Sequence, residues 1–237
     1  MKNLFTLIGV IIFITSLSAQ SNKAYENAMK SALFMHDTAS SYSSEQAVAN
    51  LYEKIAREYQ NEWLPNYWAS YVYTQLNNMY GRVPDTPKNV TKNDLMNKAQ
   101  EHLDQARSRM PDGDKLVESD IHALQALIHY FNFRMSQSAS GGEDMILEKK
   151  QQYQSELKLS LQKNLENPLV LVMLGTTLLG NKESDFKDTL AARIMLNKAN
   201  ELFKQSDTHR ALSTRWNQEW LWLFWLKHAD KKLQENL

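Results

Sequence analysis

Apolar residues recur one helical turn apart through almost the whole chain after residue 20. In the segment from Ser43 to Gln60, for example, the residues at this spacing are Ala47, Leu51, Ile55 and Tyr59. The alternation of apolar and polar residues that is typical of half-buried strands is absent. The sequence therefore predicts an all-α fold.

Glycine and proline residues divide this pattern into segments of ordinary helix length. We expect Ser44 to cap the second helix. The predicted helices span residues 22–38, 43–60, 65–80, 91–110, 114–137, 143–166, 168–180, 185–205 and 215–235. Pro65, Pro111 and Pro168 lie at or just before three of the helix starts, where a missing N–H costs nothing. They lie 46 and 57 residues apart, and periods in this range suggest an internal repeat.

The first twenty residues, MKNLFTLIGVIIFITSLSAQ, have the features of an export signal. Lys2 precedes an apolar run from Leu4 to Leu17, and Leu17-Ser18-Ala19 is a small-residue cleavage site. We predict a signal peptide at residues 1–19, cleaved after Ala19, and a single domain at residues 20–237 without a further transmembrane segment. An uncleaved N-terminal anchor is the alternative. Both place the domain outside the cytoplasm, in the periplasm or the extracellular space.

Charge and cysteine content exclude several classes of function. The 237 residues include 27 basic and 27 acidic ones, so no excess of positive charge favours nucleic acid or an anionic membrane. There is no cysteine. That excludes disulfides, thiol chemistry, cysteine-ligated metals and a lipoprotein anchor.

Two segments match the second helix of a tetratricopeptide repeat, in which small residues let paired helices approach closely. They are Ala99-x3-Leu103-x2-Ala106, followed by Pro111, and Ala192-x3-Leu196-x2-Ala199. Leu171-x2-Leu174-Gly175-x2-Leu178 matches the first helix of the same repeat. The chain thus resembles a divergent tetratricopeptide-repeat protein, similar to exported helical-repeat proteins of the Gram-negative envelope. The connection from Gly81 to Asn93 is longer than in the standard repeat.

This resemblance implies a right-handed superhelix of about four antiparallel helix pairs, closed by a C-terminal capping helix. The expected pairs are 22–38 with 43–60, 65–80 with 91–110, 114–137 with 143–166, and 168–180 with 185–205. In the repeat family, first helices line a concave groove that holds peptides or partner helices. The resemblance therefore implies a non-catalytic module that binds a protein or peptide and needs no cofactor.

The candidate partner-binding residues are polar and aromatic side chains on the predicted first helices of the middle repeats. They are Tyr67, Tyr71, Asn78, His122 and His129. Tyrosine and asparagine can grip a peptide backbone while the rings supply contact area. The alternative is that the tyrosines only cover the core beneath them.

A helical enzyme or a metal-dependent binding protein is the rival function. Glu118, His122, Gln125 and His129 share one helix face, and a carboxylate with two imidazoles could bind zinc. His122 and His129 lie about 10 Å apart along the helix, however, which is too far for one ion. A polar seam between helices is the preferred interpretation, and we expect no metal site.

Near the C-terminus, Trp220 to Leu226 are seven consecutive apolar residues. Seven helical residues rise only about 10 Å, so they cannot cross a bilayer. We expect this helix to cap the last pair. Trp222 and Trp225 either pack onto that pair, as we favour, or form an interface for a second copy or another protein.

Overall fold

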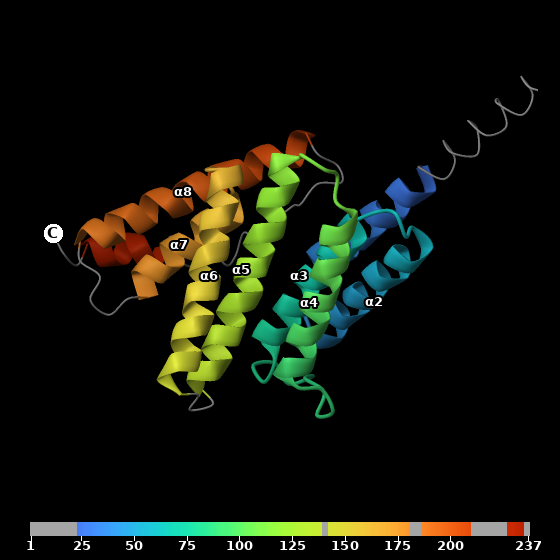
Figure 1. The fold of residues 1–237 in the computed structure, drawn as a ribbon, viewed down its shortest axis with the longest axis horizontal. Helices are drawn as coiled ribbons and strands as arrows, with labels where there is room; N and C mark the ends of the chain where they lie inside the picture. Colours follow the sequence, from blue (N-terminus) through green and yellow to red (C-terminus); the bar gives the residue numbers. More distant parts are fainter. Residues whose placement is uncertain (1–22, 139–141, 181–185, 210–226, 235–237) are drawn as a thin grey trace, which may run out of the picture.

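The computed structural model describes residues 23–138, 142–180, 186–209 and 227–234, and these residues are helical apart from the connections between helices (Figure 1). The first helix spans residues 23–38 and the last described one spans 227–234. Between them lie α2 (Tyr42–Glu58), α3 (Leu64–Met79), α4 (Lys92–Arg109), α5 (Lys115–Ser138), α6 (Glu143–Lys163), α7 (Pro168–Gly180) and α8 (Phe186–His209). The all-α prediction is confirmed.

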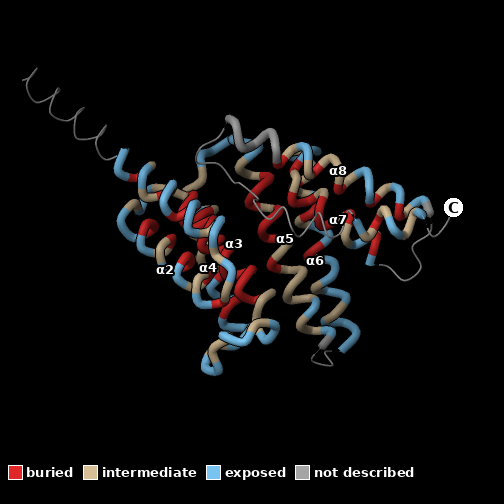
Figure 2. Tube along the Cα trace, turned by 180° about the vertical axis from the view of Figure 1, so that it is seen from behind, coloured by how far each residue is buried: buried red, intermediate tan, exposed pale blue. Residues whose placement is uncertain are grey.

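The helices follow one another in space in chain order, from helix 23–38 at one end to α7, α8 and helix 227–234 at the other (Figure 1). The most extensive contacts join α5 with α6, α3 with α4, and α7 with α8, so these three predicted pairs are confirmed. Buried segments lie where the helices face one another, and exposed segments lie on the outer faces (Figure 2). The fold is therefore a stack of antiparallel pairs, in which each pair covers the next.

Side-chain caps set the starts of α2 and α4. Ser41 rather than Ser44 is the N-cap of α2: its side chain accepts from the Ser44 backbone N–H, and the Ser44 hydroxyl in turn accepts from the Ser41 N–H. The prediction of Ser44 as the N-cap was therefore wrong by three residues. Ser44 is the other member of the capping box, at the third position of the helix. Thr91 and Asp94 form the same reciprocal pair at α4.

The long connection between α3 and α4 has a structural role. Gly81 begins it with a φ of 73°, a conformation that side chains with a Cβ rarely adopt. Asp85 then accepts from the Ser43 backbone N–H and hydroxyl, each at 2.9 Å, at the start of α2. These hydrogen bonds lower the pKa of Asp85. The lengthened turn thus caps a neighbouring helix.

The repeat motifs pack as their small residues require. The alanines and leucines of the two second-helix motifs are completely buried: Ala99, Leu103, Ala106, Ala192, Leu196 and Ala199. Gly175 of α7 lies against α8, where an added Cβ would come within 3.0 Å of the Leu196 side chain and 3.2 Å of the Ala192 carbonyl oxygen. Close approach of α7 and α8 therefore depends on the absence of a side chain at residue 175.

Helix α3 lies at the centre of the N-terminal half. It contacts α2, α4 and α5, and every residue from Leu64 to Asn77 is buried. Trp68 packs edge-on against Tyr67 and Tyr71, with ring centroids 6.0 and 5.7 Å apart. This aromatic cluster forms the core of the first two pairs.

The described end of the predicted capping helix packs on the last pair. Ala229 is completely buried, Asp230 pairs with Arg193 of α8, and Lys232 Nζ donates to the carbonyl oxygen of Leu179 at the end of α7. Trp222 and Trp225 lie outside the described residues, as does the predicted signal peptide. None of the described helices combines the length and the apolar character that a membrane span requires.

Candidate functional site

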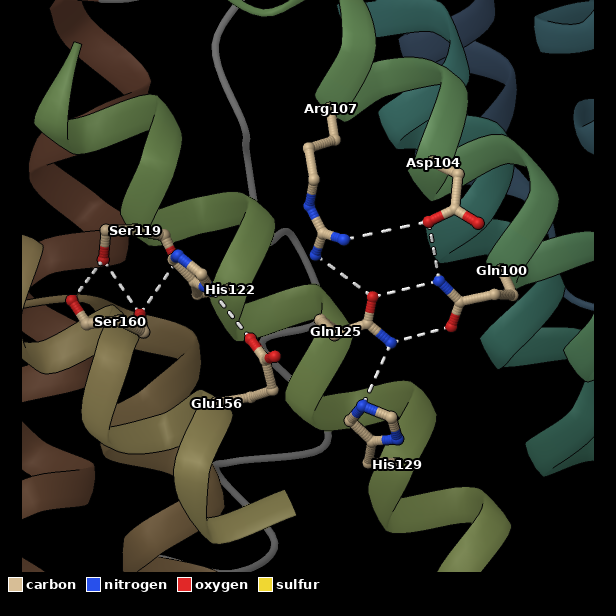
Figure 3. Close-up of polar contacts among 9 residues, drawn as sticks. All are labelled: Gln100, Asp104, Arg107, Ser119, His122, Gln125, His129, Glu156 and Ser160. Carbon is tan, nitrogen blue, oxygen red and sulfur yellow. Dashed lines mark hydrogen bonds and ion pairs between the residues drawn. The ribbon is translucent and has the colours of Figure 1, made fainter. Parts of the chain in front are cut away.

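The predicted polar face of α5 contacts two neighbouring helices (Figure 3). Toward α6, Glu118 forms an ion pair with Lys163. One turn further along α5, His122 Nδ1 lies 2.7 Å from Oε2 of Glu156. Both contacts cross the α5–α6 interface.

Toward α4, the same face forms an amide ladder. Gln100 Nε2 donates to Gln125 Oε1 at 3.0 Å, and Gln125 Nε2 donates back to Gln100 Oε1 at 2.7 Å. Arg107 Nη2 adds a third hydrogen bond to Gln125 Oε1 at 3.1 Å. Gln125 is only 4% exposed, and this part-buried network links the second and third pairs.

His129 ends the ladder. Its Nε2 lies 3.3 Å from Gln125 Nε2, and burial lowers the pKa of its imidazole. A neutral ring that accepts at Nε2 carries its proton on Nδ1. Within the described part of the chain, that buried Nδ1 has no hydrogen-bond partner.

The three side chains considered as a metal site therefore do not converge. Glu118 contacts Lys163. His122 contacts Glu156 and His129 contacts Gln125 (Figure 3). No group of three or more potential His, Cys, Asp or Glu ligands occurs in the residues that the structure describes. The geometry matches a polar seam between helices.

The predicted groove residues fall into two classes. Tyr67 is completely buried and Tyr71 is 4% exposed, and burial raises the pKa of both hydroxyls. These rings belong to the core because α3 is covered by helices on several sides, so neither lines an open groove. Asn78, His122 and His129 are partly exposed. A partner-binding role for the residues of this set remains a prediction.

One hollow that the sequence did not indicate is a polar cleft among α2, α3 and α4. It has a volume of about 400 Å³, and its lining includes Glu53, Asn66, Lys98, His102 and Arg109. These residues come from three separate helices. Helical periodicity cannot bring them together, and no motif marks them.

A second hollow, between α6 and α7, is mainly apolar. It has a volume of about 450 Å³ and is lined by Gln154, Leu157, Lys158, Leu161, Gln162, Leu165 and Leu174. Leu165 is 77% exposed, so part of this apolar lining faces solvent. The sequence feature that could have indicated this hollow is the four-residue spacing of Leu157, Leu161 and Leu165. This spacing continues one apolar stripe of α6 beyond the end of the helix. We call this surface the α6–α7 hollow.

Comparison with known proteins provides one match. No protein-family model matches the chain, and no curated protein sequence does. Among solved structures, the HusA haemophore from Porphyromonas gingivalis is similar, with a TM-score of 0.64 at 15% sequence identity. The similarity covers 88% of this chain and 94% of that chain. At this identity the likeness is one of fold, and it extends over nearly the full length of both proteins.

Proposed function

We propose that this chain is an exported, non-catalytic binding protein that holds a flat apolar ligand of the haem and porphyrin class in the α6–α7 hollow. The observation that carries the proposal is the apolar lining of that hollow, in a fold shared with a haemophore along nearly its whole length.

The lining fits such a ligand in size and character. Ligand pockets usually measure about 300–1,000 Å³ and combine apolar walls with a few polar groups. The α6–α7 hollow has a volume of about 450 Å³, with four leucines on its walls. Lys158 and two glutamines share the lining. A porphyrin ring would lie against the leucines, and Lys158 would pair with one of its carboxylates.

The lining also predicts how iron matters. Protein ligands of haem iron are usually His, Met, Cys or Tyr. None of these is among the described residues that line the hollow. Ring contact would then supply most of the binding free energy, and metal-free protoporphyrin should bind about as well as haem.

The test is a titration of the purified chain with haem and with metal-free protoporphyrin, followed by absorbance and by quenching of intrinsic fluorescence. Leu165→Asp places a carboxylate against the ring, and because Leu165 is 77% exposed the fold should tolerate the change. We expect affinity for both porphyrins to fall about tenfold or more. Ile194→Asp is the matched control, since Ile194 is 61% exposed on α8 and does not line the hollow.

Equal effects of Leu165→Asp and Ile194→Asp, or no porphyrin binding by the unchanged chain, would refute the proposal. Binding of haem alone would show that an iron ligand from another part of the chain is required, and would refute the ring-contact account.

A peptide or protein ligand is the second candidate. The exposure of Leu165 favours it, because an apolar groove can accept the apolar face of a partner helix. On this alternative, Asn78, His122 and His129 would provide polar contacts elsewhere on the surface. A chain that binds no porphyrin but loses an identified peptide ligand on Leu165→Asp would favour this second function.

A further inference from the structure

The polar cleft among α2, α3 and α4 contains two hydrogen-bond donors without partners. Asn66 is completely buried, and its Oδ1 lies 3.0 Å from His102 Nδ1, from which it accepts when the ring carries its proton on Nδ1. Its Nδ2 has no hydrogen-bond partner among the described residues, and neither does the buried Nη1 of Arg109. Both residues line the cleft. An unpaired buried donor destabilises the fold, and a bound acceptor would relieve that cost.

Three other charged groups of the cleft, Glu53, Arg57 and Lys98, already pair with one another. Glu53 Oε1 lies 3.5 Å from Lys98 Nζ, and Glu53 Oε2 lies 3.7 Å from Arg57 Nη1. The Tyr73 hydroxyl donates to Glu53 at 2.5 Å and accepts from Lys98 at 3.0 Å. Arg109, in contrast, has no ion pair in the described part of the chain. The guanidinium is thus the cation left for a ligand.

The balance of charge limits the ligand to a weakly charged anion. Three basic side chains, Arg57, Lys98 and Arg109, line the cleft beside two acidic ones, Glu53 and Glu101. Burial lowers the pKa of His102, so this ring is neutral near pH 7. One net positive charge suits a monoanion. A doubly charged phosphate would bring a negative charge that no group offsets.

We propose that this cleft binds the carboxylate of a small organic acid, with Asn66 Nδ2 and the Arg109 guanidinium as the donors. Arginine matches a carboxylate with two parallel hydrogen bonds, and the amide supplies a third donor from the floor of the cleft. The cleft shares no lining residue with the α6–α7 hollow, so this proposal does not depend on porphyrin binding.

The test compares two probes that differ in one group: N-acetylalanine and its neutral amide. NMR titration of the purified chain follows the side-chain NH₂ signals of Asn66. We expect the acid to shift these signals, and the amide to bind about tenfold or more weakly. Arg109→Gln should weaken binding of the acid by about tenfold. Arg109→Lys should weaken it less, because lysine keeps the charge but cannot donate two parallel hydrogen bonds.

Arg107→Gln is the matched control: Arg107 is on the same helix but bonds to Gln125 and does not line the cleft. It should leave acid binding unchanged. Three results would overturn the proposal: the acid and the amide bind equally, the Asn66 signals do not move, or inorganic phosphate binds more tightly than the acid. Circular dichroism of each variant would establish that the helices remain folded.

Discussion

His36 Nε2 lies 3.9 Å from Glu45 Oε2, and both side chains are less than a tenth exposed. The rings of Tyr52, Trp68 and Tyr71 surround the imidazole. The separation is too long for a hydrogen bond, so burial dominates. It lowers the pKa of His36 to about 4 and raises the pKa of Glu45 to about 7. Between these values both groups are neutral in the folded protein.

The two shifts have opposite effects on stability. His36 stabilises the fold above its unfolded pKa of 6.5, and this contribution is lost as pH falls toward 4. Glu45 stabilises the fold below its unfolded pKa of 4.5, and this contribution is lost as pH rises toward 7. The unchanged pair should therefore contribute little net pH dependence between these limits.

Single variants should reveal each half of this balance. Glu45→Gln removes the contribution of Glu45 and keeps that of His36. The free energy of unfolding of this variant should therefore fall, relative to the unchanged chain, as pH falls from 6.5 to 4. His36→Gln should do the reverse, with a relative loss as pH rises from 4.5 to 7. For each group, the difference between the folded and the unfolded pKa limits the change in the free energy of unfolding to about 3 kcal/mol. Urea unfolding at a series of pH values measures both slopes, and identical slopes in all three proteins would contradict the assignment.

Gly175→Ala tests the close approach of α7 and α8. The new Cβ would contact the Leu196 side chain and the Ala192 carbonyl, and overpacking of this kind costs about 1–3 kcal/mol. Alanine recovers up to about 1 kcal/mol through its higher helix propensity, so we expect a net loss of about 1 kcal/mol. Gly180→Ala is the control, since no atom of the described residues lies within 4 Å of its added Cβ. Equal unfolding midpoints for the two variants would show that residue 175 has more room than the structure indicates.

Asn167 joins the third pair to the fourth. Its Oδ1 accepts from the backbone N–H groups of Leu169 and Val170 at the start of α7, and its Nδ2 donates to Ser119 and Asp120 of α5. Asn167→Ala removes a helix cap and two buried hydrogen bonds, so we expect a loss of about 3 kcal/mol in thermal or urea unfolding. Asn164→Ala removes only a single local hydrogen bond to the Glu166 N–H and should cost about 1 kcal/mol or less. A loss at residue 167 no larger than this would disprove the linking role.

The helices were predictable because each has apolar residues at helical spacing, and most have a glycine or proline at a boundary. The α6–α7 hollow was not predicted, although Leu157, Leu161 and Leu165 lie one turn apart, because charged residues from Glu148 to Lys158 are typical of a solvated surface. Within this run Tyr153 and Leu157 are buried, and Glu156 contacts His122. Periodicity shows that residues share a face, but not which neighbouring helix covers it.

The placement of Tyr67 and Tyr71 illustrates the same limit. The sequence of α3, LPNYWASYVYTQLNNM, contains no charged residue. The absence of charge indicated a helix that is buried on all sides. The prediction instead followed the repeat resemblance, which places first helices along a groove. The cleft residues Asn66, His102 and Arg109 had no comparable signal, because only tertiary packing brings them together.

Trp222 and Trp225 remain open to a direct test. The residues that follow them, 227–234, pack on the last helix pair through Ala229 and Lys232. A helix that continues this packing toward its start would bury both tryptophans against the same pair. We therefore expect the chain from Gln20 onward to be monomeric by light scattering. Trp222→Gln/Trp225→Gln should then lower its free energy of unfolding by about 2 kcal/mol or more, through lost apolar burial. A dimer that this double variant converts to a folded monomer would instead identify the tryptophans as an interface between two copies.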